Sequence, residues 1–92
     1  MKKFVITYTL REYQKNYSDL YAAIKKINPD GWYHPIESAW FIKTDDSVTA
    51  NDIFDKVKSF IGGTDIIVIS EIKDDVKGYA GSNFWKWIKE DK

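Results

Sequence analysis

His34 is the only histidine in the chain, and an imidazole ring is the side chain that most readily exchanges protons near neutral pH. Glu37 and Ser38 follow three and four residues later, close enough to be candidate partners of the ring. His34 is therefore a weak catalytic candidate that would act on a ribose hydroxyl or orient a phosphate. A single histidine carries no motif, so the sequence favours the alternative, a structural histidine held by hydrogen bonds.

A second group of chemically capable residues lies in the segment 11–17, between a predicted strand and a predicted helix. In an α+β fold such a segment presents backbone N–H groups and the positive end of a helix to an anion. Arg11 and Lys15 add positive charge, and the ring of Tyr13 or Tyr17 could stack on a base. The segment lacks the glycines of a P-loop, so it predicts a phosphate-bearing ligand without ATPase activity. The alternative is an ordinary solvated loop, with Tyr17 in the core of the helix.

Together these residues predict a ligand site built from the end of the first strand, the loop after it and the segment from His34 to Trp40. The predicted ligand-binding residues are Tyr8, Thr9, Arg11, Tyr13, Lys15, Asn16, His34, Ser38 and Trp40. We expect this site to lie at or near a boundary between subunits.

Metal and cofactor chemistry has little support in the sequence. The chain has no cysteine, which excludes a disulfide framework, a thiolate zinc site and a cysteine nucleophile. The adjacent pairs 45–46 and 74–75 are aspartates without the spaced ligands of a calcium loop. Gly62-Gly63 is a single pair and no dinucleotide fingerprint. The sequence therefore predicts no metal site and no cofactor.

Length and charge limit the class of protein. A chain of 92 residues has room for one domain, and 14 cationic against 14 acidic side chains argue against a strongly basic nucleic-acid binder. Residues 1–30 nevertheless hold six cations and three anions, a net charge of +3, so a local anionic ligand stays compatible with the composition. The longest apolar run, 66–69, is far too short to cross a membrane, and we expect a cytoplasmic protein.

The spacing of apolar residues predicts an α+β fold of the ferredoxin-like kind, an antiparallel sheet with two helices on one face. Alternation indicates strands and three-to-four spacing indicates helices. The face of the sheet opposite the two helices is expected to contact solvent, a partner or the tail. The last strand is an apolar run, which suggests that both of its faces are covered. The predicted elements are a strand over 4–10, a helix over 17–27, an extended segment over 32–43 broken near 35–38, a helix capped by Thr49 and ending at 61, and a strand over 65–72.

The C-terminal tail, residues 73–92, follows the predicted core at 3–72 and carries a short helix from Ser82. Phe84, Trp85 and Ile88 fall on one face of that helix, and Trp87 is expected to point elsewhere. The chain has four Trp among aromatic residues that make up 16% of its length, more than one small domain easily buries. We therefore interpret the tail of this single domain as an oligomerisation element, in a homodimer or a higher oligomer.

Three stretches resemble the SinR-like family of small bacterial and phage-borne proteins, which is similar to the small CRISPR-associated endonuclease-like adaptation subunits and to VapD-type toxins. The stretches are Val5-Ile6-Thr7-Tyr8-Thr9-Leu10, Asn16-Tyr17-Ser18-Asp19-Leu20 and Trp32-Tyr33-His34-Pro35-Ile36-Glu37-Ser38-Ala39-Trp40. The resemblance implies a ferredoxin-like fold and a homodimer built on sheet edges or open faces.

One position departs from the nuclease-like relatives, in which the first strand ends in a Tyr-Asp pair whose aspartate is the proposed metal ligand. Here the pair is Tyr8-Thr9, and a threonine hydroxyl is a poor ligand for Mg²⁺. We therefore predict a non-catalytic protein that binds a nucleotide or a nucleic acid, for example a phage anti-defence protein that sequesters a nucleotide immune signal. The alternatives are a nuclease, dependent on Mg²⁺ or assisted by His34, and a protein-interaction module or inhibitor.

Overall fold

The first strand alternates between a buried and a more exposed face, as its sequence predicts. In the computed structural model, which describes residues 1–11 and 17–90, β1 spans Lys2–Thr9. Phe4, Ile6 and Tyr8 are buried, while Thr7 and Thr9 are exposed on the opposite face. This alternation follows from the two-residue period of a strand and fixes which side of the sheet carries the core.

Four antiparallel strands form one sheet in the order β2-β3-β1-β4. β2 (Trp32–Ile36) and β3 (Ala39–Thr44) are joined by a turn at 37–38, and β4 (Ile66–Ile72) pairs with the outer side of β1. A register shift between Tyr33 and Ile36 marks the irregularity that the sequence predicts near 35–38. With two helical crossovers, this order confirms the predicted α+β, ferredoxin-like arrangement.

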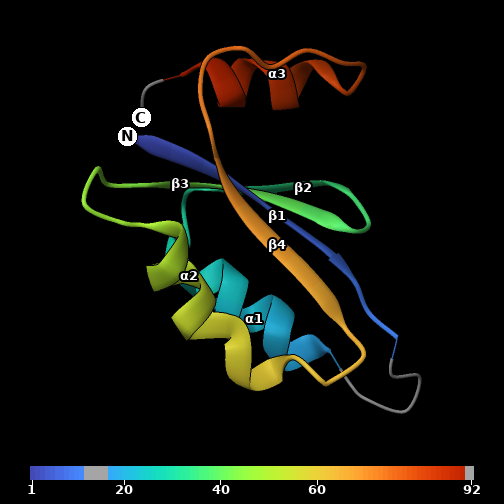
Figure 1. The fold of residues 1–92 in the computed structure, drawn as a ribbon. Coiled ribbons are helices and arrows are strands. Elements are labelled where there is room, and N and C mark those ends of the chain that lie inside the picture. The colour runs from blue at the N-terminus through green and yellow to red at the C-terminus, as the bar shows by residue number, and fades with distance from the viewer. Residues whose placement is uncertain (12–16, 91–92) are drawn as a thin grey trace.

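Two helices cover one face of the sheet (Figure 1). α1 spans Ser18–Ile27, and α2 spans Ala50–Val57 with a short 3-10 turn, η1 (Lys58–Phe60), after it. α2 begins with a capping box, because the Thr49 side chain accepts from the Asp52 N–H and the Asp52 carboxylate accepts from the Thr49 N–H. The core between helices and sheet consists of Phe4, Ile6, Tyr8, Leu20, Ile24, Trp40, Ile42, Ile53 and Val57.

The C-terminal helix α3 (Ser82–Lys89) lies on the other face of the same sheet, as Figure 1 shows. Phe84 and Ile88 are buried there, and the Phe84 ring packs edge-on against Phe41 at 4.9 Å and against Tyr33 at 5.6 Å. Trp87 also contacts Tyr33, at 5.6 Å, so the expectation that Trp87 points away from the buried face is wrong. Residues 84, 87 and 88 share one side of the helix because they are three and four positions apart.

α3 leaves the β4 side of that face open. Ile66 and Val68 of β4 keep 48% and 54% of their surface exposed, whereas Ile67 and Ile69 pack against the core. The prediction that β4 is covered on both faces is therefore wrong. Among the described residues, no helix is long and apolar enough to cross a membrane.

Candidate functional site

A surface hollow of about 550 Å³ lies where β1 ends beside the β2–β3 turn and the first half of α1. Its lining combines hydroxyl groups, one imidazole and one carboxylate, from elements far apart in the sequence. The residues that line it are Tyr8, Thr9, Leu10, Tyr21, His34, Glu37 and Ser38. Four of them, Tyr8, Thr9, His34 and Ser38, are among the predicted ligand-binding residues.

Tyr8 fixes the wall of this hollow. Its backbone N–H donates to the Ser38 carbonyl at 3.0 Å, and its hydroxyl donates to the Glu37 carbonyl at 3.0 Å. The indole N–H of Trp40 in turn donates to the Tyr8 hydroxyl at 2.9 Å. Burial raises the pKa of Tyr8 to about 12, and the neighbouring Tyr21 and Glu37 act in the same direction. Tyr8 is thus a neutral structural residue that ties the turn to β1.

His34 is held in one orientation by its own strand pair. Its Nδ1 lies 2.9 Å from the Ala39 carbonyl oxygen, and because a carbonyl only accepts, Nδ1 carries the proton in this bond. The Nε2 atom of the neutral ring is then an acceptor. The ring stacks on Trp40, with centroids 3.8 Å apart and planes 16° apart, while His34 itself stays exposed. The predicted structural role is therefore present, and it leaves one ring nitrogen for a ligand.

Trp40 is the centre of an aromatic cluster that runs from the hollow along the side of α1. The Tyr21 ring stacks on Trp40 with centroids 5.9 Å apart, and the tilted Trp32 ring lies 5.3 Å from Trp40. The ammonium of Lys25 sits 5.1 Å from the Trp32 ring centroid and 5.9 Å from that of Trp40, close enough for a cation–π interaction. We call the surface formed by Lys25 and Trp32 the α1–β2 flank.

The remaining predicted residues do not all join the hollow. Trp40 lies behind the wall and is buried, and Arg11 is exposed outside the lining. Tyr13, Lys15 and Asn16 lie outside the described residues, so the structure does not test them.

Asp65 determines how the chain enters and leaves the segment 11–17. Its carboxylate accepts from the Arg11 N–H at 2.7 Å and from the Tyr17 hydroxyl at 2.7 and 2.9 Å, and also from the Gly62 N–H at 2.8 Å. The predicted phosphate loop is therefore anchored at both ends by a carboxylate. Sequence reasoning missed this role, because a single aspartate before a strand carries no signal of long-range contacts.

The sequence analysis does not identify Tyr21 as a lining residue, and it names Glu37 only as a candidate partner of His34. Tyr21 falls within the three-to-four apolar spacing of α1, which predicts a core position, and it also lines the hollow. Within the described part of the chain, no three His, Asp or Glu side chains are grouped as metal ligands are. Glu37 is the one carboxylate among the lining residues.

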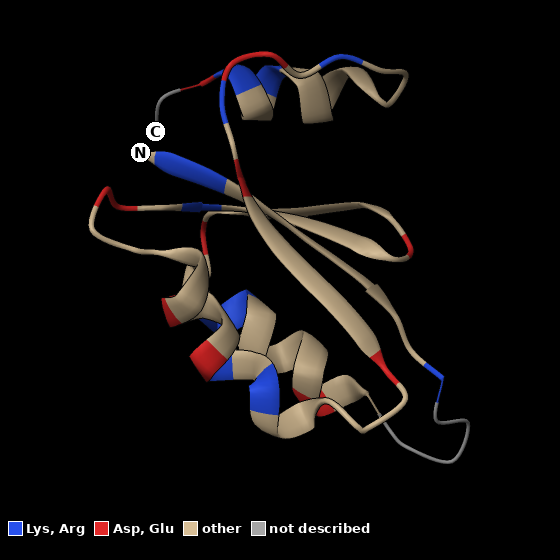
Figure 2. Cartoon of the chain, in the orientation of Figure 1, with Lys and Arg blue, Asp and Glu red and all other residues tan. Residues whose placement is uncertain are grey.

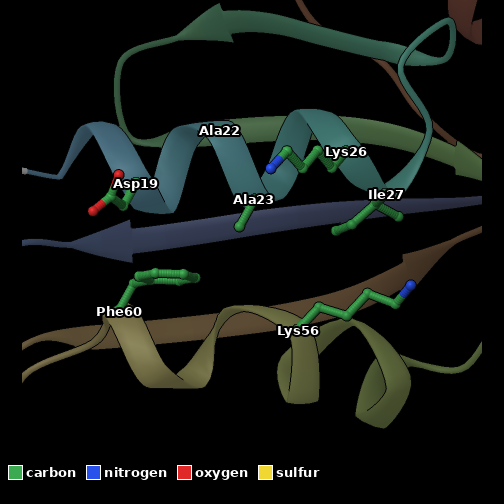
Figure 3. A pocket seen from close by; sticks show the side chains of 7 residues that line it. All are labelled: Asp19, Ala22, Ala23, Lys26, Ile27, Lys56 and Phe60. Carbon is green, nitrogen blue, oxygen red and sulfur yellow. The ribbon is translucent and has the colours of Figure 1, made fainter.

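A second hollow, of about 430 Å³, lies between α1 and the α2–η1 segment. Figure 3 shows Ala23 and Ile27 facing the gap from α1 and the Phe60 ring facing it from the other side. Lys26, Lys56 and Asp19 stand around it. Its interior is made of methyl groups and a ring, so it lacks the convergent hydrogen-bonding groups of the hollow at His34.

Comparison of the chain with protein-family models, curated proteins and solved structures finds no match. The resemblance to the SinR-like family therefore stays a prediction from the sequence.

Proposed function

We propose that this protein is a non-catalytic binding protein for a nucleotide or a nucleic acid and that the hollow at His34 holds a base. The observation that carries the proposal is the His34–Trp40 stack at the edge of the hollow, with an exposed ring and an accepting Nε2 atom. A base can stack on such a ring, and base–aromatic stacking contributes about 1–3 kcal/mol per base.

The other lining groups suit the edge of a base and disfavour its phosphate. Ser38 supplies a hydroxyl that donates or accepts, and the Glu37 carboxylate accepts from an exocyclic amino group. The same carboxylate repels a phosphate, so the phosphate should leave the hollow toward the Lys25 ammonium on the α1–β2 flank. The site would thus distinguish the two ends of a nucleotide by charge.

Two features of the lining support binding without catalysis. The hydroxyl of Tyr8 is held neutral and occupied by its bonds to Glu37 and Trp40. Thr9 stands where the nuclease-like relatives are expected to have a metal-binding aspartate, and one carboxylate, Glu37, supplies little of the charge that gathers Mg²⁺.

The test is calorimetric titration of nucleoside monophosphates and short oligonucleotides into the wild-type protein, His34→Ala and His34→Phe. We expect His34→Ala to weaken binding about tenfold or more and His34→Phe to keep most of the affinity, because phenylalanine retains the ring. Asn83→Ala, an exposed change on α3, is the control. Gently purified protein with no copurified ligand, together with no thermal stabilisation by any nucleotide, would overturn the proposal.

The Nδ1–Ala39 bond favours one second candidate, a metal-free ribonuclease in which Nε2 of His34 removes a proton from a ribose hydroxyl. Incubation with RNA in EDTA separates the two functions. Cleavage that persists in EDTA and disappears in both His34→Ala and His34→Phe would establish the nuclease. A metal-dependent nuclease would instead cleave only with Mg²⁺ or Mn²⁺.

We also propose a cytoplasmic location and self-association as a homodimer or higher oligomer. One biological role for such a protein is to sequester a nucleotide that serves as an immune signal. Capture of a host protein by nucleotide-free protein would favour the alternative of an interaction module or inhibitor.

A further inference from the structure

Glu37 brings a carboxylate to the hollow at His34 that the fold itself does not use. Burial is the main cause of the raised pKa of Tyr8, and the charge of Glu37 adds to it, so this carboxylate lies near the Tyr8 hydroxyl at the wall of the hollow. Among the described residues, the carboxylate accepts no hydrogen bond and forms no ion pair. The side chain is exposed and therefore open to a ligand.

No cation of β2 or of the β2–β3 turn neutralises this charge. Figure 2 shows an acidic position in that turn, and residues 32–38 contain no Lys or Arg. Arg11 lies outside the lining of the hollow, and the Lys25 ammonium lies against the Trp32 and Trp40 rings. Within the part of the chain that the structure describes, the Glu37 carboxylate is thus left to the hydrogen-bond donors of a ligand.

The other polar groups of the hollow discriminate poorly between bases stacked on His34. Nε2 lies in the plane of the imidazole, so it cannot bond to a base that stacks on the face of the same ring. The Tyr8 hydroxyl already forms two hydrogen bonds within the protein. The hydroxyls of Ser38 and Tyr21 each donate or accept, so they suit several bases. Glu37 only accepts, and it is therefore the group that selects the base.

We propose that the hollow at His34 selects guanine, either in a free nucleotide or as an unpaired base of a nucleic acid, an inference that rests on the proposed function. Guanine presents two adjacent donors, N1–H and the 2-amino group, which match the two oxygens of one carboxylate. In adenine and cytosine the amino group lies beside an accepting ring nitrogen, and in uracil one N–H lies between two carbonyls. A carboxylate opposite any of these three bases accepts one hydrogen bond and also faces a lone pair.

The test is calorimetric titration of guanosine, inosine, adenosine and cytidine into the wild-type protein and Glu37→Gln. Uncharged nucleosides are used because the loss of the Glu37 charge would also change the affinity for a phosphate. Guanosine should bind the wild type about 5- to 150-fold more tightly than adenosine or cytidine. Inosine, which lacks only the 2-amino group, should fall between them. Glu90→Gln, the same chemical change at the exposed residue after α3, is the matched control and should keep the preference.

Glu37→Gln should reverse the preference and not merely weaken it. The variant replaces one acceptor oxygen by an amide NH₂ group, which would face a donor of guanine. A glutamine amide instead suits adenine, because adenine also presents a donor beside an acceptor. We therefore expect Glu37→Gln to bind adenosine at least as tightly as guanosine, a result that a structural role of Glu37 would not produce.

The outcomes separate this inference from the proposed function. Equal affinity of the wild type for all four nucleosides, or a guanosine preference that survives in Glu37→Gln, would overturn the inference and leave the proposed function standing. No binding of any nucleoside, nucleotide or oligonucleotide would overturn both. Comparison of guanosine monophosphate with a short single strand that holds one guanine identifies the source, since the tighter binder of the two is the form that the site takes.

Discussion

Tyr8 joins three parts of the molecule at one hydroxyl group. It donates to the Glu37 carbonyl of the β2–β3 turn and accepts from Trp40, whose ring supports His34. The position of His34 therefore depends on Tyr8, a lining residue of the hollow whose hydroxyl is held by two hydrogen bonds. Such supporting residues set how accurately a site is organised.

Tyr8→Phe should lower the free energy of unfolding by about 1–3 kcal/mol, because the buried Trp40 N–H and the Glu37 carbonyl lose their partner. Urea denaturation measures this change. Tyr79→Phe, at a fully exposed ring of 104% relative exposure, is the control and should change nothing. Equal stability of Tyr8→Phe and the wild type would mean that water replaces both hydrogen bonds.

The raised pKa of Tyr8 gives a second prediction at the residue scale. Its pKa is about 12 in the folded protein against 10.0 as the ordinary value, so the neutral phenol is favoured by folding. The associated stability is fully present below pH 10 and is lost as pH rises from 10 toward 12. A spectrophotometric titration of tyrosinate should show a late-ionising phenol that is missing in Tyr8→Phe. Titration of every tyrosine near pH 10 would contradict it.

The residues of the candidate site were predictable to different degrees. Tyr8, Thr9, His34 and Ser38 were found because they end a strand or flank an expected turn, and such positions gather at one edge of an antiparallel sheet. Tyr21 was missed as a lining residue because helical spacing cannot show that a ring in the apolar stripe also reaches the surface. The anchoring role of Asp65 was missed because its bonds to Arg11 and Tyr17 span 54 and 48 residues.

At the scale of elements, α2 shows how local chemistry sets a boundary. Thr49 and Asp52 satisfy each other's backbone N–H groups, and these bonds, with Thr49 as the main partner, lower the pKa of Asp52. The sequence predicted this start correctly because a capping box is read directly from four consecutive residues. The end differs, since η1 tightens the last turn before the two glycines.

Thr49→Ala should lower the free energy of unfolding by about 1 kcal/mol, the usual loss for removing an N-cap hydroxyl. A lowered pKa means that the Asp52 contribution is present above the unfolded pKa and fades as pH falls through the folded one. Because the Asp52 carboxylate accepts from the Thr49 backbone N–H, the difference between Asp52→Asn and wild type in urea should shrink in acid. Ser59→Ala on η1 is the control, and a difference that stays constant down to low pH would contradict the assignment.

The strand order was predictable, but the cover of the sheet was not. Apolar alternation in β1 and helical spacing in α1 and α2 identify the ferredoxin-like plan, because few topologies connect those elements without crossing. The apolar run of β4 could not show that Ile66 and Val68 stay exposed. That outcome depends on where α3 lies, and α3 is positioned by rings of β2 and β3 rather than by its own sequence pattern.

At the scale of the whole molecule, the two faces of the sheet have different roles. The helix side holds the core and, at the edge near the turn, the candidate ligand hollow. The other side is divided between α3 and an open strip along β1 and β4, where Ile66 and Val68 of the edge strand β4 are exposed. Unpaired backbone groups of an edge strand can pair with another strand, so the predicted oligomer would most simply use this edge.

Separation of the two faces leads to a prediction about α3. Phe84→Ala removes the ring that packs on Tyr33 and Phe41, so it should cost about 3 kcal/mol and speed amide hydrogen exchange across 82–89. The amides of β1 should keep their protection against hydrogen exchange. Nucleotide affinity at the His34 hollow should stay within about twofold of wild type, because that hollow borders the opposite face of the sheet. Asn83→Ala, exposed on the same helix, controls for changes in helix propensity. If Phe84→Ala lowered nucleotide affinity as strongly as His34→Ala, the two faces would be coupled, and α3 would have to be treated as part of the ligand site.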